Sequence, residues 1–438
     1  MKRIVLVLLI TILAGAFLFG GGSRNVGDTK VVKLAHLYDP GVDENSRINF
    51  MWIDGAAKQF EAENPGTRVE LEFFPSYQQL DTKLMSDFMA GIEHGVQMTM
   101  SMQLTEHYGV GSLLNIAPYV NAWAPSEVAE FSWNPVWNEL SVGNQLFGIP
   151  VGMQVRAIAY RKDMFAAAGL DPERPPRTID ELIEYARRLT RDGVWGLGMY
   201  LGPDRATNEV SFSPYLWANG GDIWDPVTKS ATFASPEGVK TAQFLYDLVN
   251  TYRVTPEWAV SGSYVDGVLG PFINGQFAMV EGWGNYWIRQ LQEAGFVADA
   301  IPATPEARAV NVGFFHVPEG SDRYLNGWSL TIASSCRNPD EAMKLLETML
   351  KWEHLQNFLS AGLPGRRSVY QQGDYGSRFY QQWMELGSRG RPMPPTANYM
   401  VLADSIAACL QEIILSRTPV EQTLRRYQNE YNARYAGE

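Results

Sequence analysis

Cysteine and histidine are scarce in this chain of 438 residues, which has 2 cysteines and 5 histidines. The cysteines, Cys336 and Cys409, do not form a C-x-x-C motif, so the sequence argues against a structural zinc site. A disulfide between them and two separate thiols are both compatible with the sequence. We predict neither a bound metal nor a cofactor.

Long basic runs are also missing. Asp and Glu number 48 against 36 Lys and Arg, which gives a net charge of −12. This balance argues against nucleic acid and anionic membranes as partners, because both attract cationic surfaces. The sequence also lacks the G-x-S-x-G, H-E-x-x-H and P-loop motifs of several enzyme classes.

The N-terminus resembles a secretory signal peptide over residues 1–23. Lys2 and Arg3 precede an apolar run over residues 4–19, and glycines at 20–22 end that run. No lipobox cysteine follows. We therefore expect a periplasmic or otherwise extracytoplasmic protein, either free or tethered by an uncleaved signal. We expect no other segment long and apolar enough to span a bilayer.

Strand and helix patterns alternate after the signal. Residues 31–37 and 69–73 read as strands, and residues 48–63 and 77–89 read as helices. This order predicts an α/β fold with a parallel sheet and crossover helices. The chain is long enough for two or three domains.

Two further segments carry local signals. Residues 146–160 read as strand material interrupted by Pro150 and Gly152, which suits a crossing between lobes. Thr178, with Glu181 three residues later, forms the capping box of a predicted helix.

Six motifs occur in a fixed order over several hundred residues. They are DGAAKQFEAENPG (54–66), LLNIAPY (113–119), AYRKDMFAAAGL (159–170), PRTIDEL (176–182), FINGQFAM (272–279) and LPGRRS (363–368). This ordered set resembles the extracellular solute-binding proteins of ABC importers, of the sugar-binding type that includes maltose-binding protein. The chain departs from the family pattern at residues 95–100, which lack the usual Asp, and at Arg161, where Asn is usual.

The resemblance implies a two-lobed periplasmic-binding-protein fold of the venus-flytrap kind, type II, with hinge-linked lobes around a ligand cleft. We expect residues 30–150 and 312–355 in the first lobe, and residues 151–311 and 356–438 in the second. The implied function is capture of a mono- or oligosaccharide for delivery to the transmembrane subunits of an ABC permease, by a monomer without catalytic activity.

Two alternatives stay open. The same fold is compatible with a polyamine, a phosphodiester or an amino-acid derivative as ligand. A secreted glycoside-acting enzyme would instead need two carboxylates facing each other across a cleft.

Sugar binding needs aromatic faces for the ring and polar groups for its hydroxyls. Ligand loops of open α/β sheets follow the carboxyl ends of strands, which selects His36, Tyr38 and Asp39, and also Ser101 and Gln103. The resemblance adds the candidates Trp217, Glu281, Trp283, Asn285, Trp328, Arg366 and Tyr399. For the tryptophans a place in the core is the alternative, and for Arg366 a surface loop.

Overall fold

The computed structural model describes residues 29–42, 44–262, 265–284, 290–291, 294–298, 311–316, 323–358, 363–388, 390–394, 396 and 398–437. The predicted signal peptide, residues 1–23, and the candidate Asn285 lie outside these residues.

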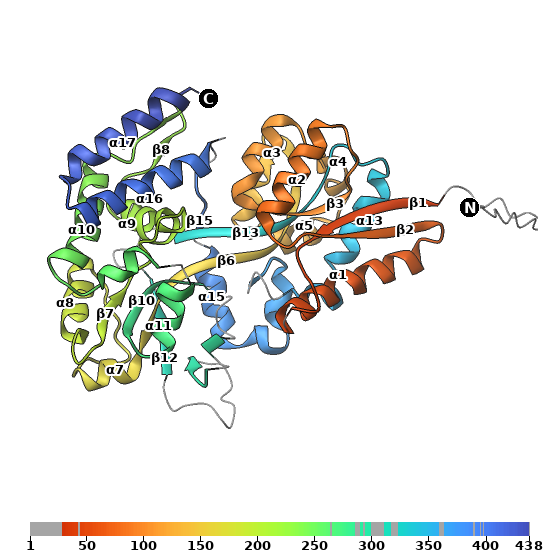
Figure 1. Cartoon of the computed structure of the whole chain (residues 1–438). Coiled ribbons are helices and arrows are strands. Elements are labelled where there is room, and N and C mark those ends of the chain that lie inside the picture. Colours follow the sequence, from red (N-terminus) through yellow and green to blue (C-terminus); the bar gives the residue numbers. More distant parts are fainter. Residues whose placement is uncertain are drawn as a thin grey trace, which may run out of the picture.

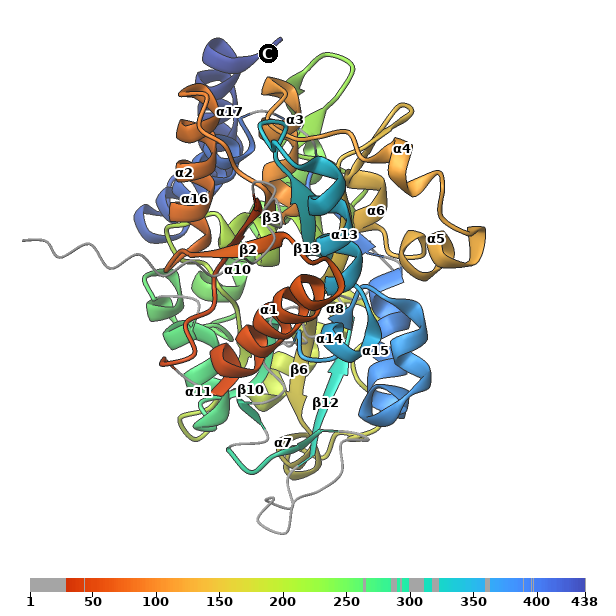
Figure 2. The same ribbon diagram turned by 90° about the vertical axis from the view of Figure 1, so that its right-hand side faces the viewer.

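The first lobe begins with the predicted alternation of strands and helices. The elements are β1 (Lys30–His36), α1 (Glu44–Glu63), β2 (Thr67–Phe73), α2 (Tyr77–Met89) and β3 (Val96–Met100). β1 lies between β2 and β3 and pairs with both in parallel, so the sheet order is β2-β1-β3. α1 packs against α13 (Pro339–Met349), as Figure 2 shows. These elements confirm the expected α/β fold.

One strand belongs to the sheets of both lobes. β6 (Gly148–Arg161) pairs with β13 (Arg323–Ile332) through its first half and with β10 (Phe277–Gly284) and β12 (Asn311–Phe315) through its second half. β13 in turn pairs with β3 in the first lobe. β6 and β13 therefore run between the lobes and form the hinge region of a two-lobed molecule (Figure 1).

β6 continues through Pro150, where the sequence suggests an interruption. Pro150 lacks a backbone N–H for the ladder, and it lies opposite Ser329, where the pairing of β6 with β13 shifts register. The irregularity of the ladder therefore accommodates the proline without ending the strand.

The second lobe contains β7 (Trp195–Gly198) and β11 (Val297–Ala298) at the ends of its sheet, with β10, β6 and β12 between them. Its main helices are α7 (Lys162–Ala167), α8 (Ile179–Leu189), α10 (Pro236–Asn250), α16 (Tyr399–Ser416) and α17 (Val420–Tyr435). The Thr178 hydroxyl accepts a hydrogen bond from the Glu181 N–H at 3.1 Å, which confirms the predicted helix cap.

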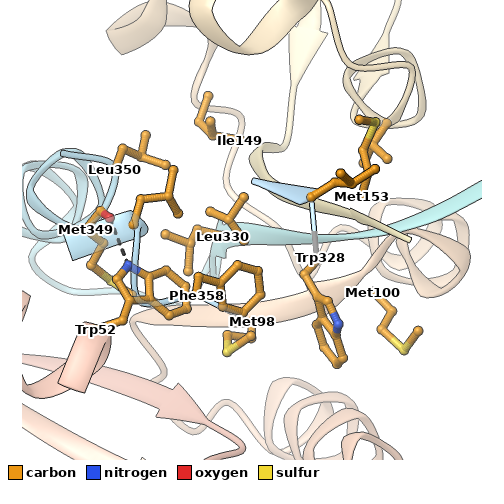
Figure 3. Close-up of a cluster of buried hydrophobic side chains, with 14 of the residues drawn as sticks. Trp52, Met98, Met100, Ile149, Met153, Trp328, Leu330, Met349, Leu350 and Phe358 are labelled. Carbon is orange, nitrogen blue, oxygen red and sulfur yellow. Dashed lines mark hydrogen bonds between the residues drawn. The ribbon is translucent and has the colours of Figure 1, made fainter. Parts of the chain in front are cut away.

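The buried side chains form two cores, a first one that fills the first lobe and continues along β10 and β12 of the second, and a second one within the second lobe. In the first lobe, Trp52 packs on Phe358 with a ring-centroid distance of 4.6 Å, and its Nε1 donates to the Met349 carbonyl at 2.9 Å (Figure 3). In the second lobe, Phe165 and Tyr215 are buried beneath α8 and α10. Buried aromatic rings thus anchor both lobes.

The first part of the 356–438 segment packs in the first lobe. Phe358 packs on Trp52 of α1, and Arg366 pairs with Glu127 of α5 (Pro125–Ser132). The family resemblance predicts this part in the second lobe, whereas among the described residues α16 and α17 lie there. The chain therefore returns to the second lobe later than residue 356, and the other domain boundaries stay predictions.

α16 corrects one expectation. By length and composition this helix is apolar enough to cross a membrane, although the sequence analysis expected no second such segment. Leu402, Ile406 and Ile413 are buried in the core that α16 shares with α10 and α17. Its apolar composition is thus explained by packing within the second lobe.

The two cysteines are both free thiols. Cys409 is buried in α16, and Cys336 is half-buried at the edge of the first core. They lie in different lobes, so the open question of a disulfide is decided against pairing.

Candidate functional site

Two strand ends of the first lobe meet at a topological switch point. With the order β2-β1-β3, the chain turns to opposite sides after β1 and β3, and ligands of open α/β sheets bind outside the carboxyl ends of such strands. β1 ends at His36, and β3 is followed by a short 3-10 turn over Ser101–Gln103. The sequence predicts ligand contacts at both ends.

At the end of β3, Ser101 reaches a cavity. The cavity has a volume of about 230 Å³. Its described lining is Ser101, Tyr108, Asn138, Glu139, Ser141 and Val142 from the first lobe, and Pro392, Met393, Pro394 and Tyr399 from the segment that leads into α16. Of the predicted residues, the structure thus brings Ser101 and Tyr399 together across the space between the lobes.

The backbone of β13 holds Ser101 in place. The Ser101 hydroxyl accepts a hydrogen bond from the Gly327 N–H at 3.1 Å. A Cβ on Gly327 would stand 2.5 Å from the Gly152 carbonyl oxygen of β6, so only glycine allows this close approach of the two hinge strands. Gln103, two residues after Ser101, is buried in the same turn.

On the second-lobe side, Tyr399 stands at the first turn of α16. Its hydroxyl donates to Glu209 Oε1 at 3.2 Å, and the same oxygen lies 3.3 Å from Arg205 Nε. These contacts fix the phenol ring at the cavity wall and give Glu209 a cationic partner.

Glu139 is a cavity residue that the sequence analysis missed. It ends α6 (Val136–Glu139), a four-residue helix with too few positions to show a periodic pattern. The residue is half-buried, but its Oε1 is enclosed and has no hydrogen-bond partner among the described residues. Burial raises the pKa of the Glu139 carboxyl to about 8, and a hydrogen bond with Ser101 opposes that rise. The group is therefore mostly protonated at neutral pH.

Trp328 lies behind the cavity wall on β13. It pairs with Met100, the residue before Ser101, and Figure 3 shows it beside Met98 and Met100. Only 7% of Trp328 is exposed, and its buried indole Nε1 has no hydrogen-bond partner among the described residues. Its buried position fits the core alternative, while its unpaired N–H is a group that a ligand or water could satisfy.

The polar residues after β1 already have protein partners. His36 is 2% exposed, and its Nδ1 accepts from the Tyr38 N–H at 3.3 Å. Burial lowers the pKa of His36 to about 4, so the ring is neutral at pH 7. Tyr38 packs edge-on against Phe358, and Asp39 accepts from the Gly41 N–H at 2.8 Å. None of these three residues is in the described lining of the cavity.

The second-lobe candidates Trp217 and Glu281 are buried. The Trp217 Nε1 donates to Asp222 Oδ1 at 3.4 Å, and the Arg391 guanidinium lies 4.8 Å above its ring. Glu281 Oε2 accepts from the Tyr215 hydroxyl at 3.0 Å. Trp217 thus takes the core position that the sequence analysis left open.

Trp283 and Arg366 complete the predicted set. Trp283 lies on β10 and pairs with Ala157 of β6, which places its backbone at the hinge. The Arg366 guanidinium donates to both Glu127 oxygens, at 2.7 and 3.1 Å, and lies 3.4 Å from Glu130. Its donors are therefore engaged within the first lobe.

The chain matches the family pattern described as bacterial extracellular solute-binding protein over residues 46–352. A probable amino-acid ABC transporter periplasmic-binding protein of Sinorhizobium fredii is 27% identical over 227 residues, which are 52% of this chain and 49% of that relative. The chain thus aligns with about half the length of this relative.

Two solved structures share the fold. The sugar-binding protein MalE from Xanthomonas citri has a TM-score of 0.75 at 18% identity, covering 92% of this chain and 97% of that one. A solute-binding protein of Thermotoga lettingae bound with α-D-tagatose has a TM-score of 0.72 at 22% identity, covering 92% and 99%. All three compared proteins are named as binding proteins rather than enzymes.

Proposed function

Because this chain belongs to the bacterial extracellular solute-binding proteins, we propose that it captures an uncharged carbohydrate between its lobes and delivers it to the permease of an ABC importer. The observation that carries this proposal is the composition of the cavity wall. Ser101, Ser141 and Tyr399 offer hydroxyl groups and Asn138 offers an amide, while Val142 and Met393 offer apolar surface. This mixture suits the hydroxyls and C–H faces of a sugar.

Charge argues against the other ligand classes. A phosphodiester or an amino-acid carboxylate is normally bound by Arg or Lys, and the described lining contains neither. A polyamine requires several carboxylates, whereas Glu139 is the one carboxyl residue among the described lining. The amino-acid assignment in the name of the Sinorhizobium fredii relative therefore finds no support in this cavity.

The number of carboxyl residues in the described lining also bears on catalysis. A glycoside-acting enzyme would need a second carboxylate across the cavity from Glu139. On the second-lobe side Glu209 stands behind Tyr399 and pairs with Arg205, and it is not in the described lining. Binding without chemistry therefore fits the site better.

The hinge supports a transport cycle. The cavity wall includes residues of both lobes, so a ligand that contacts both favours the closed arrangement by its higher affinity for it. Rotation about β6 and β13 is the hinge motion that this topology allows. We infer that the ligand-bound, closed monomer docks to the permease outside the cytoplasm after export by the N-terminal signal.

A thermal-shift screen of the chain from Asp28 onward tests the proposal. The ligands are D-tagatose, maltose, maltotriose, sn-glycerol 3-phosphate, spermidine and the common amino acids. A ligand at a hundredfold excess over its dissociation constant stabilises the folded state by about 2.7 kcal/mol. We expect a rise in Tm with a sugar that is recovered unchanged. A rise with the charged solutes alone contradicts the carbohydrate assignment, and hydrolysis of the sugar contradicts binding without catalysis.

A further inference from the structure

Glu139 occupies an unusual position in the cavity wall. α6 packs against α5, β4 (Ser141–Val142), β6 and β13, so the Glu139 carboxyl lies close to the hinge strands. Its Oε1 is shielded from solvent without a hydrogen bond from any described residue. An enclosed polar atom without a partner costs about 1–3 kcal/mol, which a ligand group can recover.

The described residues around the cavity place no positive charge beside Glu139. Among the described lining residues there is no Lys, Arg or His. On α5, Glu127 and Glu130 are held by Arg366, so that cation is engaged elsewhere. The Ser101 hydroxyl lowers the pKa of the carboxyl group, against the larger effect of burial. Burial without a cation favours the protonated form, and the raised pKa of Glu139 agrees with this geometry.

We propose that Glu139 determines the ligand specificity of this cavity by presenting an uncharged carboxyl group to a hydroxyl of an uncharged ligand. The inference rests on the proposed function. It adds a residue and a selection rule, namely that the cavity binds uncharged, hydroxyl-bearing ligands in preference to charged ones. The protonated carboxyl both donates and accepts a hydrogen bond, as a sugar hydroxyl does. An anionic ligand gains no charge partner here, and a cationic ligand would have to ionise an enclosed acid.

Three variants separate the roles of charge and hydrogen bonding. Glu139→Gln keeps a neutral group that donates and accepts, whereas Glu139→Met keeps the length of the side chain and removes both oxygens. Glu184→Gln, an exposed carboxylate of α8, is the matched control for the loss of one charge. Affinity is measured by calorimetry at pH 7 with whichever of D-tagatose, maltose and maltotriose binds the unmodified protein most tightly, and thermal unfolding shows that each variant folds.

We expect Glu139→Met to weaken sugar binding by about tenfold or more, and Glu139→Gln and Glu184→Gln to stay within about threefold of the unmodified protein. If Glu139→Met does not fold, Glu139→Ala takes its place in the same comparison. If Glu139→Met binds the sugar as tightly as the unmodified protein does, the role of Glu139 is overturned and the proposed function stays intact. Equal losses in Glu139→Gln and Glu139→Met show an ionised carboxylate and overturn the selection rule. Failure of all three sugars to bind the unmodified protein instead contradicts the proposed function itself.

Discussion

The ends of β1 and β3 differ in how their polar groups are satisfied, although the two strands are parallel neighbours at the same switch point. After β1, His36 and Asp39 hydrogen-bond to backbone N–H groups within their own turn. After β3, Ser101 lies at the cavity, beside a Glu139 oxygen without a described partner. Position at a strand end therefore does not by itself place a side chain at the cavity, and an unsatisfied polar group is the more informative sign of a candidate ligand contact.

One large test of this comparison is the response of His36 to acid. The pKa of His36 is lowered to about 4 by burial, so between pH 6.5 and 4 the unfolded chain binds a proton that the folded protein excludes. The contribution of His36 to the free energy of unfolding is fully present above pH 6.5. It falls as the pH decreases, by on the order of 3 kcal/mol. In the His36→Asn variant, the Asn Oδ1 replaces the Nδ1 acceptor. Urea unfolding of this variant should show a smaller loss of stability between pH 6.5 and pH 4.

The informative quantity is the change in the free energy of unfolding with pH, because the smaller Asn side chain also lowers stability at every pH. A variant with the same acid slope as the unmodified protein would show that His36 is not the buried neutral group of the β1 end.

Glu139 should show the opposite dependence. Its pKa of about 8 exceeds the ordinary value, so the folded protein binds the extra proton and stability falls as the pH rises toward and through 8. Glu139→Gln removes this loss, and we expect it to gain on the order of 4 kcal/mol relative to the unmodified protein between pH 5 and pH 9. Urea unfolding at the two pH values without ligand measures the gain, and a constant difference would contradict the buried, protonated state.

The smallest effects come from the two strand-end side chains themselves. Ser101→Ala removes the acceptor of the Gly327 N–H and a hydroxyl from the cavity, so we expect a loss of about 1 kcal/mol in stability and about tenfold in sugar affinity. Asp39→Ala removes the acceptor of the Gly41 N–H, so we expect a similar or smaller loss of stability and little change in affinity. Calorimetry on both variants compares the strand ends directly, and a larger affinity loss in Asp39→Ala would reverse the comparison.

Local signals account for the parts of the fold that were predictable from sequence. α2 has the predicted bounds of Tyr77 and Met89, and the Thr178 cap forms as its motif indicates. These features depend on residues within one or two turns of each other. The continuity of β6 depends instead on its pairing with β13, which lies 170 or more positions further along the chain, and no local pattern contains this pairing.

The site was predictable to a smaller extent. Ser101 follows from the strand-end rule and Tyr399 from the family resemblance, and both reach the cavity. Glu139 was missed because α6 is short and its carboxyl gains its environment from β13 and β6, which are distant in sequence. Trp217 carries the aromatic type expected of a ligand contact, but its ring is covered by Arg391. Residue type alone does not distinguish these cases.

The sharing of β6 also has a consequence for how the molecule gains and loses its structure. Each lobe uses one half of this strand, and loss of either half exposes the hydrogen-bonding edges of β13 or of β10 and β12. Neither lobe is therefore a self-sufficient piece of chain, and local opening of one sheet removes support from the other. The strand that allows the lobes to move relative to each other also links the stability of their two sheets.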